Sequence, residues 1–256
     1  MPAKKLKLSN KPSDLKKPED FPVQLTYVLI GICVLVAVLE LGFYFFGGEE
    51  AFDIIINEFG FSTQGFLEGA WWTPITSIFL HGSPDHLIFN LIVLYFFGKA
   101  TEEKLGWKKM LLIFFVAGFA GDLFSLTGSL FGLIPLDIPT IGASAAIFGL
   151  MGVSMILDPL EMVFYPFLIP IPLIFVAVLY GLFNIVAALE IVITGASSQT
   201  AYLAHIGGLT VGGIFGFHEA GLKKALIMLG IIIVLVIAVP LVLQYLQIFD
   251  YTGLFN

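Results

Sequence analysis

Seven long apolar stretches, each near the length of a membrane-spanning helix, constrain what this chain can fold into. A helix needs about 20 mostly apolar residues to cross the hydrocarbon core of a bilayer. The composition agrees, because 58% of the 256 residues are hydrophobic, only 12% are charged, and the mean hydropathy is +0.99. We therefore predict an all-α polytopic membrane protein. The expected spans cover residues 23–46, 84–101, 109–128, 141–157, 171–193, 201–217 and 223–246.

The basic residues indicate how these spans are oriented. All 12 are lysines, and they cluster before the first span, around the turn between the second and third, and before the seventh. Seven crossings place the three clusters on one side, which the positive-inside rule makes the cytoplasm. We expect a cytoplasmic N-terminus and an outer C-terminus. Without arginine the chain lacks a basic patch suited to phosphates or bases, so we expect no nucleic-acid partner.

The chain is expected to form one membrane domain with short additions. Residues 1–22 are a basic cytoplasmic tail, and the long apolar run that follows argues against a cleaved signal peptide. Residues 23–218 form the core, and residues 219–256 form the seventh span with a short outer tail. The protein is expected in the membrane of a prokaryotic cell.

Two segments between spans are unusual. Residues 47–83 mix acidic and apolar residues and contain Trp71 and Trp72, an aromatic pair typical of a membrane interface. We expect this segment to lie in or on the outer leaflet. Four prolines between residues 159 and 172 predict an interfacial segment before the fifth span, because proline interrupts helices.

Polar side chains inside the predicted spans are costly to place in lipid and are therefore functional candidates. Serine is common in membrane helices, but a membrane-buried histidine needs a partner. For Asp122 and Glu190 we expect only structural hydrogen bonds. The set consists of Glu40, His86, Asn90, Asp122, Ser144, Asn184, Glu190 and His205.

Small residues predict that Ser144 and His205 meet. Stripes of alanine and glycine begin at Ala204 in the sixth span and at Ala145 in the fourth, and such stripes allow helices to approach closely. If the stripes face each other in two parallel helices, Ser144 and His205 point to the same side of the contact. A nucleophile and a base at hydrogen-bond distance are the minimum set for acyl transfer. The alternative is that the stripes serve packing alone and that His205 bonds to a backbone carbonyl.

His86 and Asn90 form a second polar pair. They are four residues apart near the start of the second span, so they share one helix face. Ser83 is expected to cap this helix. Both side chains can donate hydrogen bonds. Taken as an isolated pair, they are expected to anchor the outer segment.

Taken in order, these motifs resemble the rhomboid family of intramembrane serine proteases, and the resemblance covers nearly the whole chain. It implies a six-helix core with one additional C-terminal span, the 6+1 form. The motifs are Trp72…Thr76…Phe79-Leu80-His81, His86-x-x-x-Asn90, Gly98-x-x-x-Glu102, Gly142-x-Ser144 and Ala204-His205-x-x-Gly208-x-x-x-Gly212.

The resemblance also implies roles for individual residues. Ser144 is the expected nucleophile and His205 the general base, without a third acidic group. The side chains of His86 and Asn90 and the backbone N–H of Ser144 form the expected oxyanion hole. No cofactor or metal is implied, and residues 194–200 are the expected capping loop. The supporting residues are His81, Phe148, Gly142, Gly208, Gly212 and Glu102.

The expected substrates are transmembrane proteins, cleaved near the outer membrane face. A helix whose backbone hydrogen bonds are all satisfied resists cleavage, so substrates should carry helix-weakening residues. Three positions depart from the family pattern. Ala145 stands where glycine is frequent, Phe148 where tyrosine is frequent, and Thr73 where arginine follows the loop tryptophan, which leaves Glu102 without that partner.

Other functions remain open at this point. A rhomboid-like pseudoprotease that binds membrane proteins is the main alternative, although such relatives usually lack the serine or the histidine. A zinc hydrolase using His81, His86 and His205 is less favoured, because no HExxH motif is present. An aspartyl protease requires a second membrane aspartate beside Asp122. A transporter would be expected to contain an inverted repeat, and none is visible.

Overall fold

The computed structural model of the protein describes residues 24–163, 170–194 and 202–245. Its long helices are α1 (Leu25–Phe59), α4 (Pro84–Leu105), α5 (Trp107–Leu130), α6 (Ser144–Leu157), α7 (Leu173–Thr194), α8 (Tyr202–Ala220) and α9 (Leu222–Tyr245). Among the described helices, α1, α5, α7 and α9 are long and apolar enough to cross a membrane. These helices confirm the predicted fold class, an all-α polytopic membrane protein.

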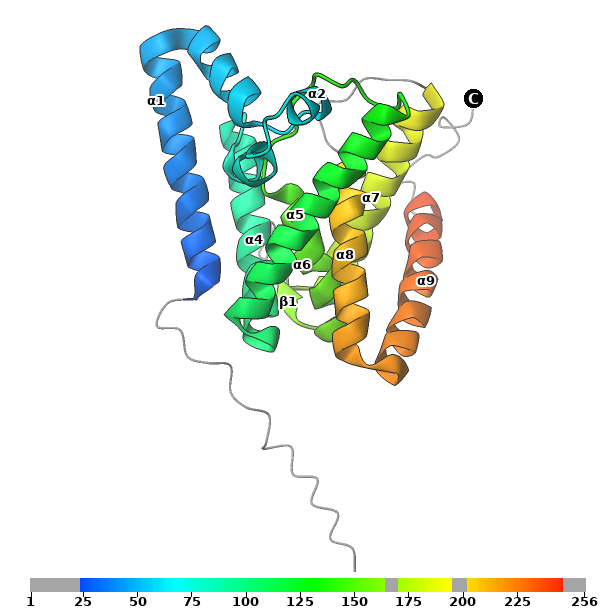
Figure 1. The fold of residues 1–256 in the computed structure, drawn as a ribbon. Coiled ribbons are helices and arrows are strands. Elements are labelled where there is room, and N and C mark those ends of the chain that lie inside the picture. The colour runs from blue at the N-terminus through cyan, green and yellow to red at the C-terminus, as the bar shows by residue number, and fades with distance from the viewer. Residues whose placement is uncertain (1–23, 164–169, 195–201, 246–256) are drawn as a thin grey trace, which may run out of the picture.

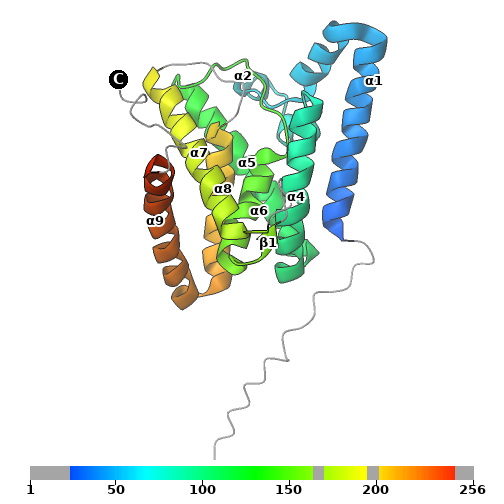
Figure 2. The same cartoon turned by 180° about the vertical axis from the view of Figure 1, so that it is seen from behind.

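Helix α6 lies at the centre of the bundle, with α4, α5, α7 and α8 packed around it, while α1 and α9 stand at opposite edges (Figure 1 and Figure 2). All residues of α6 from Ala146 to Leu157 are buried. With 14 residues, α6 is about 21 Å long, which is shorter than a hydrocarbon core of about 30 Å. The Leu157 end lies at the lysine-bearing end of the bundle, and Ser144 lies at the other end of the helix.

Helices α6 and α8 touch at the level of their backbones. A Cβ atom on Gly208 would collide with the carbonyl oxygen of Ala145, and one on Gly212 would collide with that of Gly149. Neither glycine can therefore carry a side chain without moving the helices apart. The predicted contact between the two small-residue stripes is present.

The outer segment begins close to the predicted place. The backbone leaves helical geometry at Gly48, whose φ of 71° favours glycine, close to the predicted end of the first span at residue 46, and a second helical stretch then runs on to Phe59. The short helices α2 (Thr63–Leu67), α3 (Thr73–Thr76) and η2 (Ser77–Phe79) follow. The side chains of Trp71 and Trp72 are exposed, as expected for residues at a lipid interface.

The proline-rich segment after α6 contains a small hairpin. Strand β1 (Met162–Val163) pairs antiparallel with β2 (Ile171–Pro172), with Val163 opposite Ile171. Helix α7 begins at Leu173, two residues later than predicted, because Ile171 and Pro172 are paired with β1 instead.

Glu102 has an unambiguous set of partners although Thr73 replaces the expected arginine. Its carboxylate accepts hydrogen bonds from the backbone N–H groups of Leu25 and Thr26, at 2.6 and 2.9 Å, and from the Thr26 hydroxyl at 2.6 Å. The first N–H groups of a helix have no intrahelical acceptor. Glu102 therefore caps α1 and joins it to α4.

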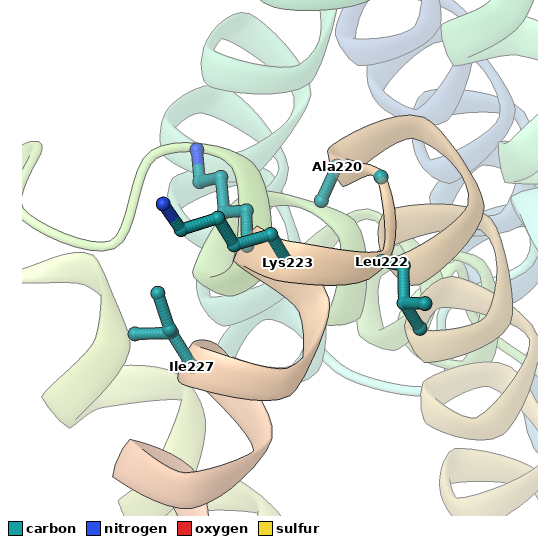
Figure 3. A pocket seen from close by; sticks show the side chains of 6 residues that line it. Ala220, Leu222, Lys223 and Ile227 are labelled. Atoms are coloured by element: carbon teal, nitrogen blue, oxygen red, sulfur yellow. The ribbon is translucent and has the colours of Figure 1, made fainter.

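The lysines of the described chain gather at the same end of the bundle as this cap. Lys109 pairs with Glu219 at 2.7 Å, and Lys104 pairs with Asp158 at 3.0 Å. The Lys224 ammonium donates to the Leu157 carbonyl oxygen, so the α8–α9 turn packs on the end of α6. Figure 3 shows this turn, with Lys223 and Leu222 pointing in different directions beside a hollow of about 500 Å³. The six lysines of the N-terminal cluster lie outside the described residues.

Candidate active site

Ser144 and His205 lie at hydrogen-bond distance in the interior of the bundle. The Ser144 Oγ atom is 2.7 Å from the His205 Nε2 atom. Ser144 is the first residue of α6, whereas the predicted span began at residue 141, and His205 lies in the first turn of α8. The close approach of α6 and α8 at Gly208 places both side chains on the same side of the contact.

The imidazole of His205 is buried and contacted from several directions. Phe148, one turn after Ser144 on α6, stacks on the ring, and Tyr202 approaches it edge-on with centroids 6.4 Å apart. The His205 Nδ1 atom is 2.5 Å from the Asn184 Oδ1 atom of α7. The sequence marked Asn184 only as a polar residue inside a span, and nothing in its spacing from His205 indicated this contact.

His86 and Asn90 lie beside the chain that leads into Ser144. Ser83 caps α4 as predicted, since its Oγ atom accepts a hydrogen bond of 3.2 Å from the His86 N–H. A Cβ atom on Gly142 would lie 2.6 Å from the His86 Nε2 atom and 3.3 Å from the Asn90 Nδ2 atom. Gly142 is thus required twice, by this crowding and by its φ of 108°.

The side-chain amide of Asn90, next to Gly142, contains a hydrogen-bond donor without an acceptor among the described residues. This donor is the Nδ2 atom, and the side chain that carries it is buried. A buried donor without an acceptor is costly, and in native proteins it calls for an explanation. Here the donor lies close to the backbone just before Ser144, where a bound carbonyl oxygen could accept from it.

His81 lies next to His86 and is itself held by Glu40. Its backbone N–H donates to both carboxylate oxygens of Glu40, at 3.0 and 3.1 Å, and its ring lies 5.2 Å from the His86 ring between centroids. Burial, together with the nearby His86, lowers the pKa of His81 to about 4. His81 is therefore neutral at pH 7, and its Nδ1 atom lies 3.0 Å from the Phe79 carbonyl oxygen.

These side chains adjoin a cavity of about 1170 Å³. Ser144, His205, His86, Asn90 and Asn184 supply polar groups to its wall. Much of the remaining wall is apolar and comes from the connection at residues 132–141 and from facing residues of α4 and α7. The cavity is large enough for a short stretch of polypeptide, and the expected capping loop at 194–200 lies almost wholly outside the described residues.

The other predicted residues lie away from this polar group. Gly208 and Gly212 form the helix contact, and Glu102 caps α1. Asp122 is buried in α5, and its Oδ2 atom has no hydrogen-bond partner within the described residues. Glu190 is exposed on α7. No group of three His, Cys, Asp or Glu side chains suited to a metal ion occurs in the described part of the chain.

Comparisons with known proteins add independent findings. The Rhomboid domain family matches residues 68–221, more than half of the chain. Rhomboid protease GluP of Bacillus subtilis is 30% identical over 202 residues, which cover 78% of this chain and 35% of that protein. RHOMBOID-like protein 12, mitochondrial, of Arabidopsis thaliana is 30% identical over 174 residues, covering 63% of this chain and 50% of that protein.

A third relative bears on activity. Inactive RHOMBOID-like protein 8 of Arabidopsis thaliana is 36% identical over 84 residues, which cover 33% of this chain and 22% of that protein. The chain spans half or less of the length of the three relatives named here.

Proposed function

The chain belongs to the rhomboid family, and on that premise we propose that it is an intramembrane serine endopeptidase in which Ser144 and His205 form the catalytic dyad. The observation that carries this proposal is the 2.7 Å separation of Ser144 Oγ and His205 Nε2 at the wall of a large cavity. A serine hydroxyl is a weak nucleophile unless an adjacent base accepts its proton. His205 is the base within reach.

The proposed reaction is acyl transfer to Ser144 followed by hydrolysis. The Ser144 oxygen attacks the carbonyl carbon of the scissile peptide bond while His205 Nε2 takes the hydroxyl proton. The tetrahedral intermediate collapses, and His205 gives the proton to the leaving amine. Water, deprotonated by the same histidine, then attacks the acyl-enzyme and releases Ser144.

His86 and Asn90 are proposed to hold the oxyanion. Their side chains lie next to Gly142, two residues before Ser144, and Asn90 Nδ2 is a buried donor that lacks a partner among the described residues. The backbone N–H of Ser144 begins α6, where amides have no intrahelical acceptor. Donors fixed in advance around a developing negative charge lower the barrier, and loss of one costs about 10²–10³-fold in rate.

The proposed substrates are transmembrane helices of other proteins. The polar groups lie below the membrane surface, since α6 is too short to reach from one surface to the other. A substrate helix must expose its backbone there, so helix-weakening residues should mark the cleavage site.

The orientation and the division of the chain are also proposals. The lysine-bearing end is placed in the cytoplasm and the cavity toward the outer face. Residues 1–22 form the cytoplasmic tail, residues 23–218 the protease core, and residues 219–256 the last span and outer tail. We propose the membrane of a prokaryotic cell as the location.

A pseudoprotease is the second candidate, favoured by the similarity to a relative named as inactive. Ala145, next to the nucleophile, is the position at which this chain could have lost activity. The two candidates differ in one outcome, because a binding protein would not react covalently at Ser144.

The test is active-site labelling of the purified protein with a fluorophosphonate, together with cleavage of a model transmembrane substrate. We expect labelling and cleavage by the native protein and loss of both in Ser144→Ala and His205→Ala. Thr210→Val serves as a matched control, since it removes an exposed hydroxyl from α8 that bonds only locally, to the Ile206 carbonyl. Unchanged labelling and cleavage in Ser144→Ala would refute the dyad, and a folded native protein that neither labels nor cleaves would favour the pseudoprotease.

A further inference from the structure

Asn184 is held between two partners in the interior of the bundle. Its side chain is 4% exposed on α7. The Nδ2 group donates a hydrogen bond of 2.8 Å to the Tyr180 carbonyl oxygen, one turn earlier in the same helix. The Oδ1 atom lies 2.5 Å from His205 Nδ1. An amide side chain bound at both ends is fixed in orientation.

The hydrogen-bonding capacity of these groups determines where the imidazole proton lies. The Tyr180 carbonyl can only accept, so the amide nitrogen of Asn184 must face it and the amide oxygen must face His205. That oxygen is also only an acceptor, so the proton of neutral His205 must be on Nδ1. The lone pair of Nε2 then points at the Ser144 hydroxyl, 2.7 Å away.

We propose that Asn184 is a positioning residue that holds His205 in the tautomer and ring orientation needed for it to accept the Ser144 proton. This inference rests on the proposed function. It converts the expected dyad into a three-residue chain, Asn184–His205–Ser144, whose members come from three different helices. In the alternative tautomer Nε2 would carry a proton and could not act as a base, and that error is severe in serine proteases.

The choice of an amide fits the surroundings. An ionised carboxylate buried at this depth would carry a large desolvation cost unless it were paired. A neutral amide oxygen accepts from Nδ1–H in both the neutral and the protonated ring, so it remains bonded while the ring takes up and returns a proton. Phe148 limits tilting of the ring through its stacked contact, and Asn184 limits rotation within the ring plane.

The first test measures steady-state cleavage of the model substrate by the full-length protein and two variants at position 184. Asn184→Leu is close in size but removes the acceptor, and we expect kcat to fall about 10- to 100-fold, by analogy with the loss of a group that orients a metal-ligating histidine. KM should stay nearly unchanged, since Asn184 acts through His205. Asn184→Asp restores an oxygen acceptor but loses the donor to Tyr180 and places a carboxyl group in the interior, so it should recover only part of kcat. Ile185→Ala, on the exposed side of the same helix, is the matched control and should behave as the native protein.

The second test reads the tautomer directly. The ¹⁵N chemical shifts of histidine-labelled protein distinguish protonated from unprotonated ring nitrogens, and His205 is assigned by the loss of its signals in His205→Ala. We expect the native ring to be protonated at Nδ1 and the Asn184→Leu ring to be a mixture. A native ring protonated at Nε2 would overturn the proposal even if no variant at position 184 folds.

The results for Ser144→Ala and Asn184→Leu distinguish a failure of the proposed role of Asn184 from a failure of the proposed protease function. Cleavage by Ser144→Ala would refute the dyad itself. If Ser144→Ala is inactive while Asn184→Leu keeps native kcat, or loses only substrate affinity, the dyad stands and the role of Asn184 falls.

Discussion

The phenyl ring of Phe148 lies flat against the imidazole of His205, with centroids 4.5 Å apart and planes inclined by 11°. Phe148 is one helical turn after Ser144, so a single helix carries both the proposed nucleophile and the surface on which the base rests. The contact is purely one of shape and ring electronics, because phenylalanine has no hydroxyl. The tyrosine frequent at this position in the family is therefore not needed for stacking.

Replacing Phe148 tests this contact. Phe148→Leu removes the ring, and because an aromatic pair contributes about 0.5–1.5 kcal/mol, we expect kcat of substrate cleavage to fall up to about tenfold. Phe148→Tyr should keep nearly native activity. Phe119→Leu, at an exposed site on α5, is the control for loss of an aromatic ring. Equal losses in the leucine and tyrosine variants would contradict a stacking role.

Removing the Glu102 carboxylate should loosen α1. Glu102→Ala leaves the N–H groups of Leu25 and Thr26 without their acceptor, and we expect the free energy of unfolding to fall by about 3 kcal/mol. Thermal unfolding in detergent measures it. The neighbouring Glu103→Gln is the control, since Glu103 forms an exposed 3.7 Å pair with Lys99, worth about 0.5 kcal/mol. Similar losses in both variants would count against the cap.

The glycine contact between α6 and α8 gives a prediction with an internal control. Gly208→Ala drives a methyl group into the Ala145 carbonyl, so we expect a loss of about 1–3 kcal/mol in stability and a displaced His205. Gly213→Ala, on the same helix, meets no atom within 4 Å and should be neutral or slightly stabilising. Fluorophosphonate labelling and thermal unfolding report the two effects. Equal behaviour of the two variants would show that the close approach is not required.

The burial of His81 predicts that acid destabilises the protein. Because the pKa of His81 is about 4 in the folded protein and about 6.5 when unfolded, the unfolded chain binds more protons between these values. His81 should therefore lower stability by about 2 kcal/mol between pH 7.5 and pH 5, with no contribution above pH 7.

The measurement is the thermal midpoint across this pH range in the native protein and in His81→Gln. The glutamine variant should lose part of the pH dependence, whereas His218→Gln, at an exposed histidine, should retain it. A pH dependence that is identical in His81→Gln and the native protein would contradict the assignment.

Much of the fold followed from the sequence because lipid leaves few alternatives to a helix. The apolar runs located all seven long helices to within a few residues, and the backbone is non-helical at Gly48, two residues after the predicted end of the first span. The second helical stretch of α1, which runs on to Phe59, was not predicted. The stripes from Ala204 and Ala145 correctly placed Ser144 beside His205, since small residues dictate which helix faces touch.

The contacts of Asn184 and Glu40 were beyond reach of the sequence for different reasons. Asn184 lies on α7 and His205 on α8. Which face α7 turns toward α8 depends on how their side chains pack, and α7 has no unbroken stripe of alanine and glycine from which that face could be predicted. Glu40 accepts a hydrogen bond from the backbone N–H of His81. Nearly every residue type carries a backbone N–H, so the sequence does not show which one Glu40 will bind.

The two carboxylates that hold α1 suggest how this helix behaves mechanically. Of its 35 residues only Thr26, Leu29, Cys33 and Glu40 are buried, and in lipid an apolar helix surface has no hydrophobic driving force for packing against another apolar helix. Glu102 fastens one end of the membrane-spanning part to α4, and Glu40 fastens the other to His81. Carboxylate hydrogen bonds therefore hold α1 at two separate points along its length, and loss of either one should weaken its attachment at that point while the close contact of α6 and α8 is left intact.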